Sequence, residues 1–241
     1  MIRLVLFSMI FSATICGSYS QNFTYSKDYP KLFLDSESNE SPYFYPSLKT
    51  RFLKEGENFS KEEMLALLVG QTAQKSYNAY GMVGLEKSFL MAEQFSADTI
   101  LKYGEKVLEL NPVSLSLNFG LWKTYQKIQD LAKANIFKKR FELLCETILY
   151  TGDGTKNSPY FVISPIDGMV IISKYKENEV TTMGSGENEE GYFLDILGFK
   201  SEVQEGTFHF VIDHGMGGLS KMLMEIGANN INAKATHFFN N

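Results

Sequence analysis

The sequence predicts an α+β fold in which antiparallel helical hairpins come first and a small, mainly antiparallel β-sheet follows. Up to about residue 151, apolar residues recur at three- and four-residue spacing, which is the period of a helix packed on one face. After about residue 158, short runs of β-branched and aromatic residues are bounded by Pro, Asp and Gly, as strands are. Helices followed by strands, without alternation, indicate an α+β order rather than a βαβ order.

Residues 96–150 contain three helical patterns in succession, and the rest of the chain is organised around them. In the first pattern, Ile100, Gly104 and Val107 fall on one helical face. Asn111-Pro112 ends it, because proline lacks an amide hydrogen and disfavours helix at the preceding residue. Helices joined by connections this short are predicted to pack antiparallel.

The second pattern is apolar on two sides, with Leu117 and Leu121 on one side and Trp122 on another. A helix of this kind is expected to be buried between its neighbours. Together with Tyr125 and Ala134 in the paired helices, the run resembles the tetratricopeptide pattern of about 34 residues. At most one and a half units are visible, and about three are needed for a free-standing solenoid. The hairpins are therefore expected to rest on another part of the chain.

The segment before these helices is predicted to be irregular at its start and helical toward its end. Residues 21–40 are polar and indicate an irregular lead-in, and the two prolines within residues 41–46 favour an extended or turn path. Residues 48–54 suggest a short helix. Ser60 and Glu63 form a capping box, which predicts a further helix that begins directly after Ser60.

Four strands are predicted in the second half of the single domain that we expect over residues 41–226. They cover residues 160–163, 169–172, 192–199 and 207–213. The polar, glycine-bearing stretch 176–191 is predicted to be an exposed loop or hairpin tip. A short helix over residues 219–226 and a loose tail over residues 227–241 complete the chain.

The first twenty residues have the pattern of a secretory signal peptide. Arg3 supplies the positive start, and residues 4–15 form an apolar core too short to span a membrane. Ser18 and Ser20 fit the small-residue rule for cleavage before Gln21. The sequence thus predicts export to the periplasm or beyond the cell, with lipid attachment at Cys16 as the alternative, and no transmembrane segment.

Composition narrows the classes of function. The net charge is −5 over 241 residues, and the sequence shows no concentrated basic face. Both observations argue against a nucleic-acid binder. After signal cleavage only Cys145 remains, so no internal disulfide can form. Cys145 lies on the apolar stripe of the third helix and is predicted to be a buried structural residue rather than a nucleophile.

Three stretches of the chain resemble the bacterial domain of unknown function 4919, which is found in secreted proteins. They are residues 41–52, residues 70–81, and Leu110-Asn111-Pro112 with the downstream segments 152–154 and 161–164. The resemblance covers about residues 41–200 and implies a signal peptide and a helical unit that feeds a small β part. It implies no activity, because the family has none assigned, and no catalytic residue follows from it.

Candidate metal ligands occur near the last strand, where His209, Asp213 and His214 lie close together in sequence. On a strand, residues 209 and 213 face one side and residue 214 the other, which separates the two histidines. Asp153 and Asp167 each stand beside glycine, but they lack the alternating oxygen ligands of a calcium loop and favour turns. We therefore expect no metal and no cofactor.

Two functions follow as alternatives. The first is a non-catalytic protein- or peptide-binding module built on the helical hairpins, with Tyr43, Tyr45, Tyr77 and Tyr80 as its interaction surface. The second is a periplasmic enzyme or metal-dependent binder with a site near the C-terminal strands. It would draw on Asp153, Asp167, His209, Asp213 or His214. A concave polar pocket between the helical layer and the sheet would favour the second.

Overall fold

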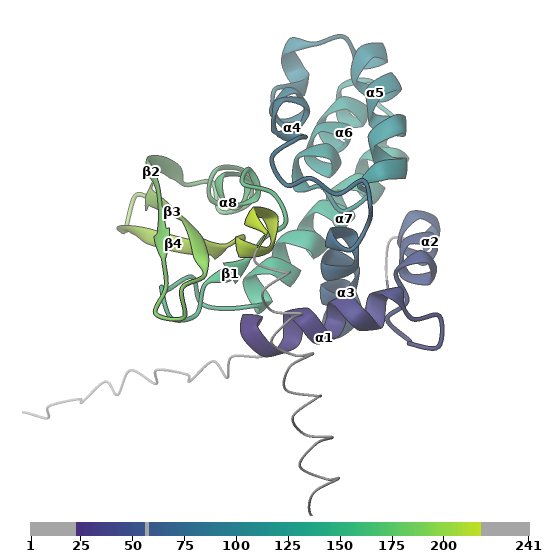
Figure 1. Cartoon of the computed structure of the whole chain (residues 1–241). Coiled ribbons are helices and arrows are strands. Elements are labelled where there is room, and N and C mark those ends of the chain that lie inside the picture. The colour runs from purple at the N-terminus through teal and green to yellow at the C-terminus, as the bar shows by residue number, and fades with distance from the viewer. Residues whose placement is uncertain (1–22, 56–57, 218–241) are drawn as a thin grey trace, which may run out of the picture.

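The computed structural model describes residues 23–55 and 58–217. A helical part and a four-stranded sheet lie side by side, with the long helix α7 at the centre (Figure 1). The predicted α+β order is confirmed, because helices fill the chain up to Tyr150 and all strands follow. The predicted signal peptide, the predicted helix 219–226 and the tail 227–241 lie outside the described residues.

The helices α5, α6 and α7 are those predicted over residues 96–150. The helical part consists of α1 (Tyr25–Glu37), α2 (Tyr45–Glu55), α3 (Lys61–Thr72), α4 (Val83–Leu90), a 3₁₀ turn (Ala92–Gln94), α5 (Ala97–Leu110), α6 (Leu115–Lys127) and α7 (Leu131–Tyr150). The predicted capping box at the start of α3 is present, since the side chains of Ser60 and Glu63 each accept the other's backbone N–H.

Helix α6 is buried between neighbours, as its two-sided apolar pattern predicts. Every residue from 115 to 121 is buried, and α4, α5 and α7 pack around the helix. Gly120 permits the approach of α4, because a Cβ there would lie 2.6 Å from the Phe89 carbonyl oxygen. The antiparallel hairpins are thus present in the fold, while their likeness to tetratricopeptide units stays a prediction.

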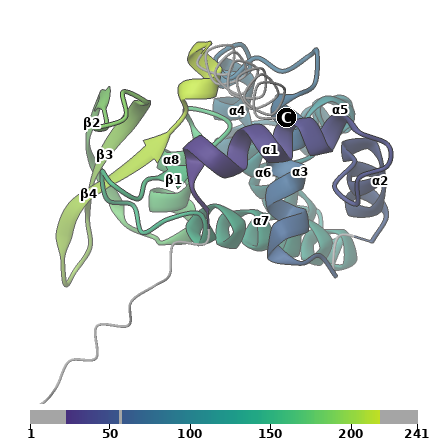
Figure 2. The same ribbon diagram turned by 60° about the horizontal axis from the view of Figure 1, so that its bottom comes forward.

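The predicted irregular lead-in over residues 21–40 is wrong, because α1 occupies most of it. The helix crosses α3 and runs from the sheet side of the molecule toward α2 (Figure 2). Tyr25, Tyr29 and Phe33, spaced four residues apart, are all buried on one face of α1. Packing of this aromatic face outweighs the helix-disfavouring Pro30, which lies inside the helix.

The sheet has the order β1-β4-β3-β2. Its strands are β1 (Tyr160–Phe161), β2 (Glu179–Glu187), β3 (Phe193–Lys200) and β4 (Glu205–Val211). The pairs β2–β3 and β3–β4 are antiparallel and β1–β4 is parallel. The predicted mainly antiparallel sheet is therefore confirmed.

Two predictions in this half are wrong. The expected strand over residues 169–172 is helical, with α8 (Asp167–Val170) leading into a π-helical turn (Ile171–Tyr175). A short, largely buried apolar run fits either a strand or a helix, so hydrophobic periodicity could not decide between them. The stretch 176–191, expected to be an exposed loop or hairpin tip, is exposed and ends in the β2–β3 turn, but most of it is the strand β2, whose polar composition reflects an edge exposed on both faces.

One contiguous apolar core joins the two halves. It includes buried residues of α1, α3, α7, β1, α8 and β4, and a smaller cluster fills the space between α4, α5 and α6. Cys145 is fully buried in the larger cluster, as predicted, and burial raises the pKa of its thiol well above the ordinary value. No helix within the described residues is long and apolar enough to cross a membrane.

Candidate functional site

The four tyrosines that were predicted to form an interaction surface do not share an environment. Tyr45 is buried in the core, and its hydroxyl donates to the Gln71 side chain, so the prediction is wrong for Tyr45. Tyr77 is half-buried and donates to the Ile163 carbonyl oxygen at 2.8 Å, while Tyr43 packs against the core. Only Tyr80, at 43% exposure, presents its ring to solvent among these four.

The predicted metal candidates near β4 are held apart by separate contacts. The His209 ring lies 3.2 Å from the Gly154 carbonyl oxygen, and Asp213 accepts the Phe193 backbone N–H at 3.0 Å. Asp153 accepts the Thr155 amide within its own turn, as its turn prediction requires. The described residues contain no group of three or more His, Cys, Asp or Glu side chains placed to hold a metal ion.

His214 lies in an aromatic box rather than in a metal site. Its ring centroid is 5.0 Å from Tyr29 and 5.1 Å from Phe161, and the Tyr77 ring stacks on it at 6.1 Å. The Tyr25 hydroxyl accepts the His214 backbone N–H and meets the ring Nδ1 at 3.2 Å. Burial lowers the pKa of His214 to about 3, so the ring is neutral at physiological pH.

A pH-dependent stability follows from this burial. The unfolded chain protonates His214 near pH 6.5, whereas the folded chain resists protonation to about pH 3. The contribution of the neutral, buried His214 ring to folding stability is thus complete above about pH 6.5 and is lost as the pH falls toward 3. We expect wild type to lose about 2 kcal/mol relative to His214→Phe between about pH 7.5 and about pH 5. Urea unfolding of both proteins measures this, and parallel pH profiles would contradict it.

A polar cleft does lie between the helical part and the strand segment. Glu86 of α4 is buried at its base and accepts the Ser114 hydroxyl at 3.0 Å and the Ser164 hydroxyl at 2.5 Å. Gln71, Tyr77, Asn78 and Asn111 are among the residues that line the walls. One carboxyl group thereby ties together α4, the α5–α6 connection and the segment that follows β1.

Asp167 lies behind this cleft and is also buried. Its Oδ2 accepts the backbone amides of Ile163 at 3.1 Å and Ser164 at 2.9 Å, while Oδ1 is buried without a hydrogen-bond partner within the described chain. Burial, and secondarily the Glu86 carboxyl, raises the pKa of Asp167 well above its ordinary range. The pKa of Glu86 is raised by burial as well.

Two neighbouring carboxyls with raised pKa values are the arrangement that acid–base catalysts use, so the size of the cleft decides their role. Its volume of about 40 Å³ holds only a few water molecules, which leaves no room for a substrate beside Glu86. Glu86 holds α4 to the α5–α6 connection and to the segment that follows β1, and Asp167 fixes that segment through two of its backbone amides. Sequence reasoning missed Glu86, since a single Glu in a weak helical pattern gives no signal of burial.

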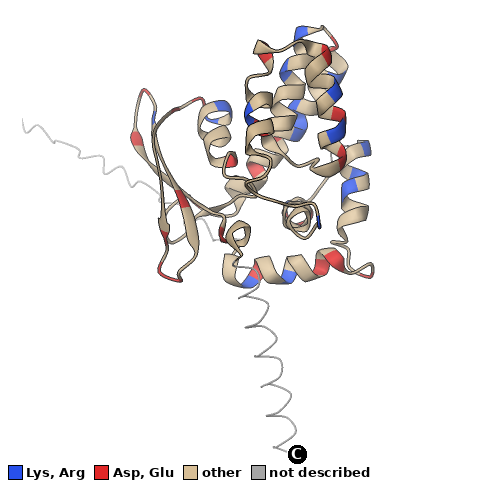
Figure 3. Cartoon of the chain, turned by 45° about the horizontal axis from the view of Figure 1, so that its top comes forward, with Lys and Arg blue, Asp and Glu red and all other residues tan. Residues whose placement is uncertain are grey.

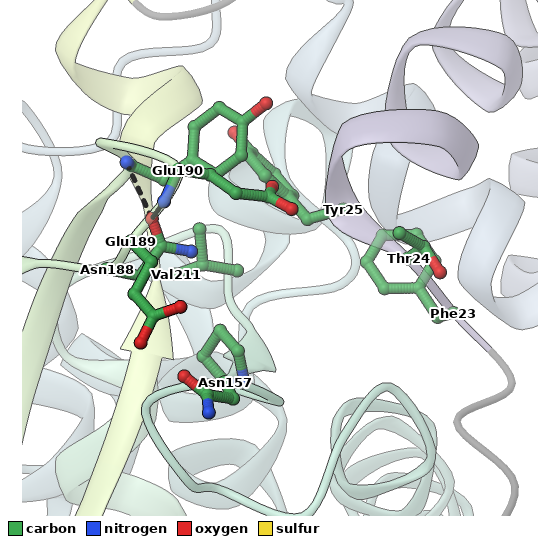
Figure 4. A pocket seen from close by; sticks show the side chains of 10 residues that line it. Phe23, Thr24, Tyr25, Asn157, Asn188, Glu189, Glu190 and Val211 are labelled. Carbon is green, nitrogen blue, oxygen red and sulfur yellow. Dashed lines mark hydrogen bonds between the residues drawn. The ribbon is translucent and has the colours of Figure 1, made fainter.

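A larger pocket of about 240 Å³ lies at the end of the sheet where α1 begins. Phe23, Thr24 and Tyr25 form one wall, and the turn between β2 and β3 supplies Glu189 and Glu190 on another (Figure 4). Asn188 fixes this turn, because its side-chain oxygen accepts the backbone amides of Glu190 and Tyr192 at 3.1 and 2.9 Å. The pocket is below the usual size for a drug-like ligand and suits a single side chain.

The strand β2 leads directly into that turn and forms an edge of the sheet. Of its nine residues only Val180 and Gly186 are partly covered, and Met183 is 75% exposed. Within the described chain β2 pairs with β3 alone. Figure 3 shows acidic residues on the strands and turns of the sheet, with most basic residues on the helices. These features make the β2 edge and the adjoining pocket the candidate site.

Comparisons with known proteins bear on the family and leave the activity open. No protein with a curated description matches the chain, and no solved structure matches it. The model of one family, described as Domain of unknown function (DUF4919), matches residues 35–210 and so covers most of the helical part and nearly all of the sheet. The chain therefore belongs to the DUF4919 family.

Proposed function

We propose that this chain is an exported, non-catalytic protein that binds an extended segment of another protein by strand addition to β2. The observation that carries the proposal is the edge itself, which is nine residues long, exposed on both faces and, among the described residues, paired on one side only. An extended peptide can complete such an edge through backbone hydrogen bonds, with alternate side chains read by the neighbouring surface. The proposal keeps a protein or peptide partner but moves its docking surface from the helices to the sheet.

The shape of the edge supports this reading. Natural edge strands are commonly short or covered, because a free row of N–H and C=O groups invites pairing with another chain. Here the strand is longer than the usual five or six residues. It carries a bulge between Val180 and Thr182, which leaves a regular stretch of paired residues from Thr182 to Glu187. That stretch is long enough to pair with a short peptide.

A pair of proline variants tests strand addition. Neighbouring residues of a strand direct their backbone groups to opposite edges, so Gly184→Pro and Ser185→Pro remove amides from different sides. We expect one variant to lower thermal stability and the other to lower peptide affinity by about tenfold at unchanged stability. The probes are three short synthetic peptides in which Val alternates with polar residues. Some polar positions are Thr in all three, and the others are Lys in the first peptide, Gln in the second and Glu in the third. Binding is followed by fluorescence polarisation.

Amide hydrogen exchange supplies the second measurement. On peptide binding, the outward-facing amides of β2 should become protected while those of α5 and α6 stay unchanged. If none of the three peptides protects β2, or if both proline variants bind peptide as wild type does, strand addition at this edge is wrong.

Export is part of the same proposal, supported by the signal-peptide pattern of residues 1–20. N-terminal sequencing of the protein recovered from the cell envelope or the culture medium should begin at Gln21. A protein that retains Arg3 and stays in the cytoplasm would contradict export, and a lipid-modified N-terminus at Cys16 would establish the alternative route.

A further inference from the structure

The sheet carries a strong excess of negative charge that the net charge of the chain conceals. Between residues 177 and 205 there are eight acidic residues and one basic residue, although the whole chain has a net charge of only −5. The acidic residues are Glu177, Glu179, Glu187, Glu189, Glu190, Asp195, Glu202 and Glu205. Resting on the proposed strand addition, we propose that the segment bound at β2 is basic, with a Lys or Arg seated beside Glu187 and Asp195.

The register of the sheet selects these two carboxyls. Ser185 pairs with Asp195 and Glu187 pairs with Phe193, so Glu187 and Asp195 face the same side of the sheet. The bulge between Val180 and Thr182 turns Glu179 to the opposite side, where it pairs with Lys200 and already has a basic neighbour. The uncompensated acidic charge of β2 and β3 is therefore concentrated toward the β2–β3 turn.

An apolar position lies next to this acidic one. Met183, which is 75% exposed, pairs with Leu197 and faces the same side as Glu187 and Asp195. Alternate residues of an added strand would project onto this face. The bound segment thus has a basic residue near Glu187 and, four residues along, an apolar residue against Met183.

A second acidic site lies beyond the β2–β3 turn, in the pocket at the end of the sheet where α1 begins. Phe23, Tyr25 and Val211 give it apolar walls, and Glu189 and Glu190 stand at its acidic side (Figure 4). A Lys or Arg side chain matches this arrangement, since its methylene stem packs on apolar surface while its charged head meets carboxylates. Its volume of about 240 Å³ accommodates one such side chain.

The same charges argue against a second copy of this chain as the occupant. Strand β2 carries Glu179 and Glu187 and no basic residue, so a β2–β2 pair would bring two acidic edges together. Like charges directly opposite each other in a ladder are destabilising, and charged edge strands are a common protection against self-association. A basic partner converts the same charges into attraction.

The three synthetic peptides described above test the charge preference directly. At about pH 7.5 and low salt, the Lys peptide should bind about five- to tenfold more tightly than the Gln peptide, and the Glu peptide most weakly. The differences should shrink as salt is added, because Glu187 is exposed to solvent and Asp195 only partly buried, so salt screens both charges. Burial raises the pKa of Asp195 to about 6, so its carboxyl is ionised at this pH.

Charge variants separate this inference from the proposed function. Glu187→Gln combined with Asp195→Asn should remove most of the advantage of the Lys peptide and leave the Gln peptide unaffected. Glu202→Gln is the matched control, because Glu202 is exposed in the turn at the opposite end of β3 and should keep the preference intact.

The possible results distinguish the basic preference from strand addition itself. Equal protection of β2 by all three peptides would overturn the basic preference and leave strand addition standing. Protection by none would remove strand addition itself. A concentration-dependent dimer that protects β2 without any peptide, detected by analytical ultracentrifugation and hydrogen exchange, would overturn the basic partner in favour of a second copy.

Discussion

Replacing Tyr29 with Ala should lower the free energy of unfolding by about 3–5 kcal/mol, as removal of a fully buried aromatic side chain does. Tyr29 has 0% exposure, and its ring lies 5.1 Å from Tyr25, 5.6 Å from Phe161 and 5.0 Å from His214. The substitution leaves a cavity where α1 meets β1 and the end of the sheet. Urea unfolding followed by circular dichroism measures the change.

Tyr29→Phe is the matched control, since it keeps the ring and removes only the hydroxyl. That hydroxyl lies 2.9 Å from the Thr72 hydroxyl, so the control should cost about 1 kcal/mol. A Tyr29→Ala variant within about 0.5 kcal/mol of wild type would restore the irregular lead-in that the sequence suggested.

A large loss of stability in Tyr29→Ala would place the start of the folding unit within α1. The family match starts at residue 35, which leaves most of α1 outside it. Even so, Tyr25, Tyr29 and Phe33 are part of the main apolar core. A chain cut at residue 35 should therefore be less stable than one that begins at Gln21, although both contain nearly the whole matched region.

Asp167→Ala is the second substitution with a large expected effect, a loss of about 2–4 kcal/mol. The change leaves the buried amides of Ile163 and Ser164 without their acceptor, and each unsatisfied amide costs free energy. It also loosens the segment whose Ser164 hydroxyl holds Glu86, and through it the contact between α4 and the strand segment.

Asp167→Asn should stay within about 1 kcal/mol of wild type near neutral pH, because its amide oxygen can accept the same two bonds. Burial raises the pKa of Asp167 and so favours its neutral form in the fold, and Asn supplies a neutral side chain of the same shape. Equal losses for the Ala and Asn variants would show that the carboxyl is needed in its charged form.

The pH dependence of this pair has a definite sign. In the unfolded chain Asp167 ionises near the ordinary aspartate pKa of 3.8, while the folded chain keeps the proton to higher pH. The folded state then binds more protons, so the contribution of Asp167 to stability falls as the pH rises above about 4. The stability of Asp167→Asn lacks this pH dependence, so the variant should become more stable relative to wild type as the pH rises. Urea unfolding across a pH series can measure this.

Local patterns predicted the elements whose environment is regular. The capping box of Ser60 and Glu63, the break at Asn111-Pro112 and the two-sided apolar pattern of residues 115–121 each depend on neighbours along the chain. Such neighbours are visible in the sequence, and their geometry follows from helix periodicity. The fully buried Cys145 follows from the same periodicity.

Elements that depend on distant partners were misassigned. Helix α1 is held by residues far along the chain, since Tyr25 bonds to His214 and Tyr29 to Thr72. Its polar remainder and Pro30 gave no local sign of this. The largely buried run after Asp167 folds as α8 and a π-helical turn, and its apolar pattern misled because strand and helix patterns look alike in a short buried segment.

The sequence by itself determined the order of helices and strands, the central buried helix, the mainly antiparallel sheet and the resemblance that proved to be the family. Tertiary structure alone decided that β2 is an edge strand of the described sheet, that Glu86 and Asp167 are both buried, and that His214 lies in an aromatic box. The physical reason is the range of the interactions. Periodicity and capping act over a few residues, whereas burial of a charge or exposure of an edge depends on segments that meet only after folding.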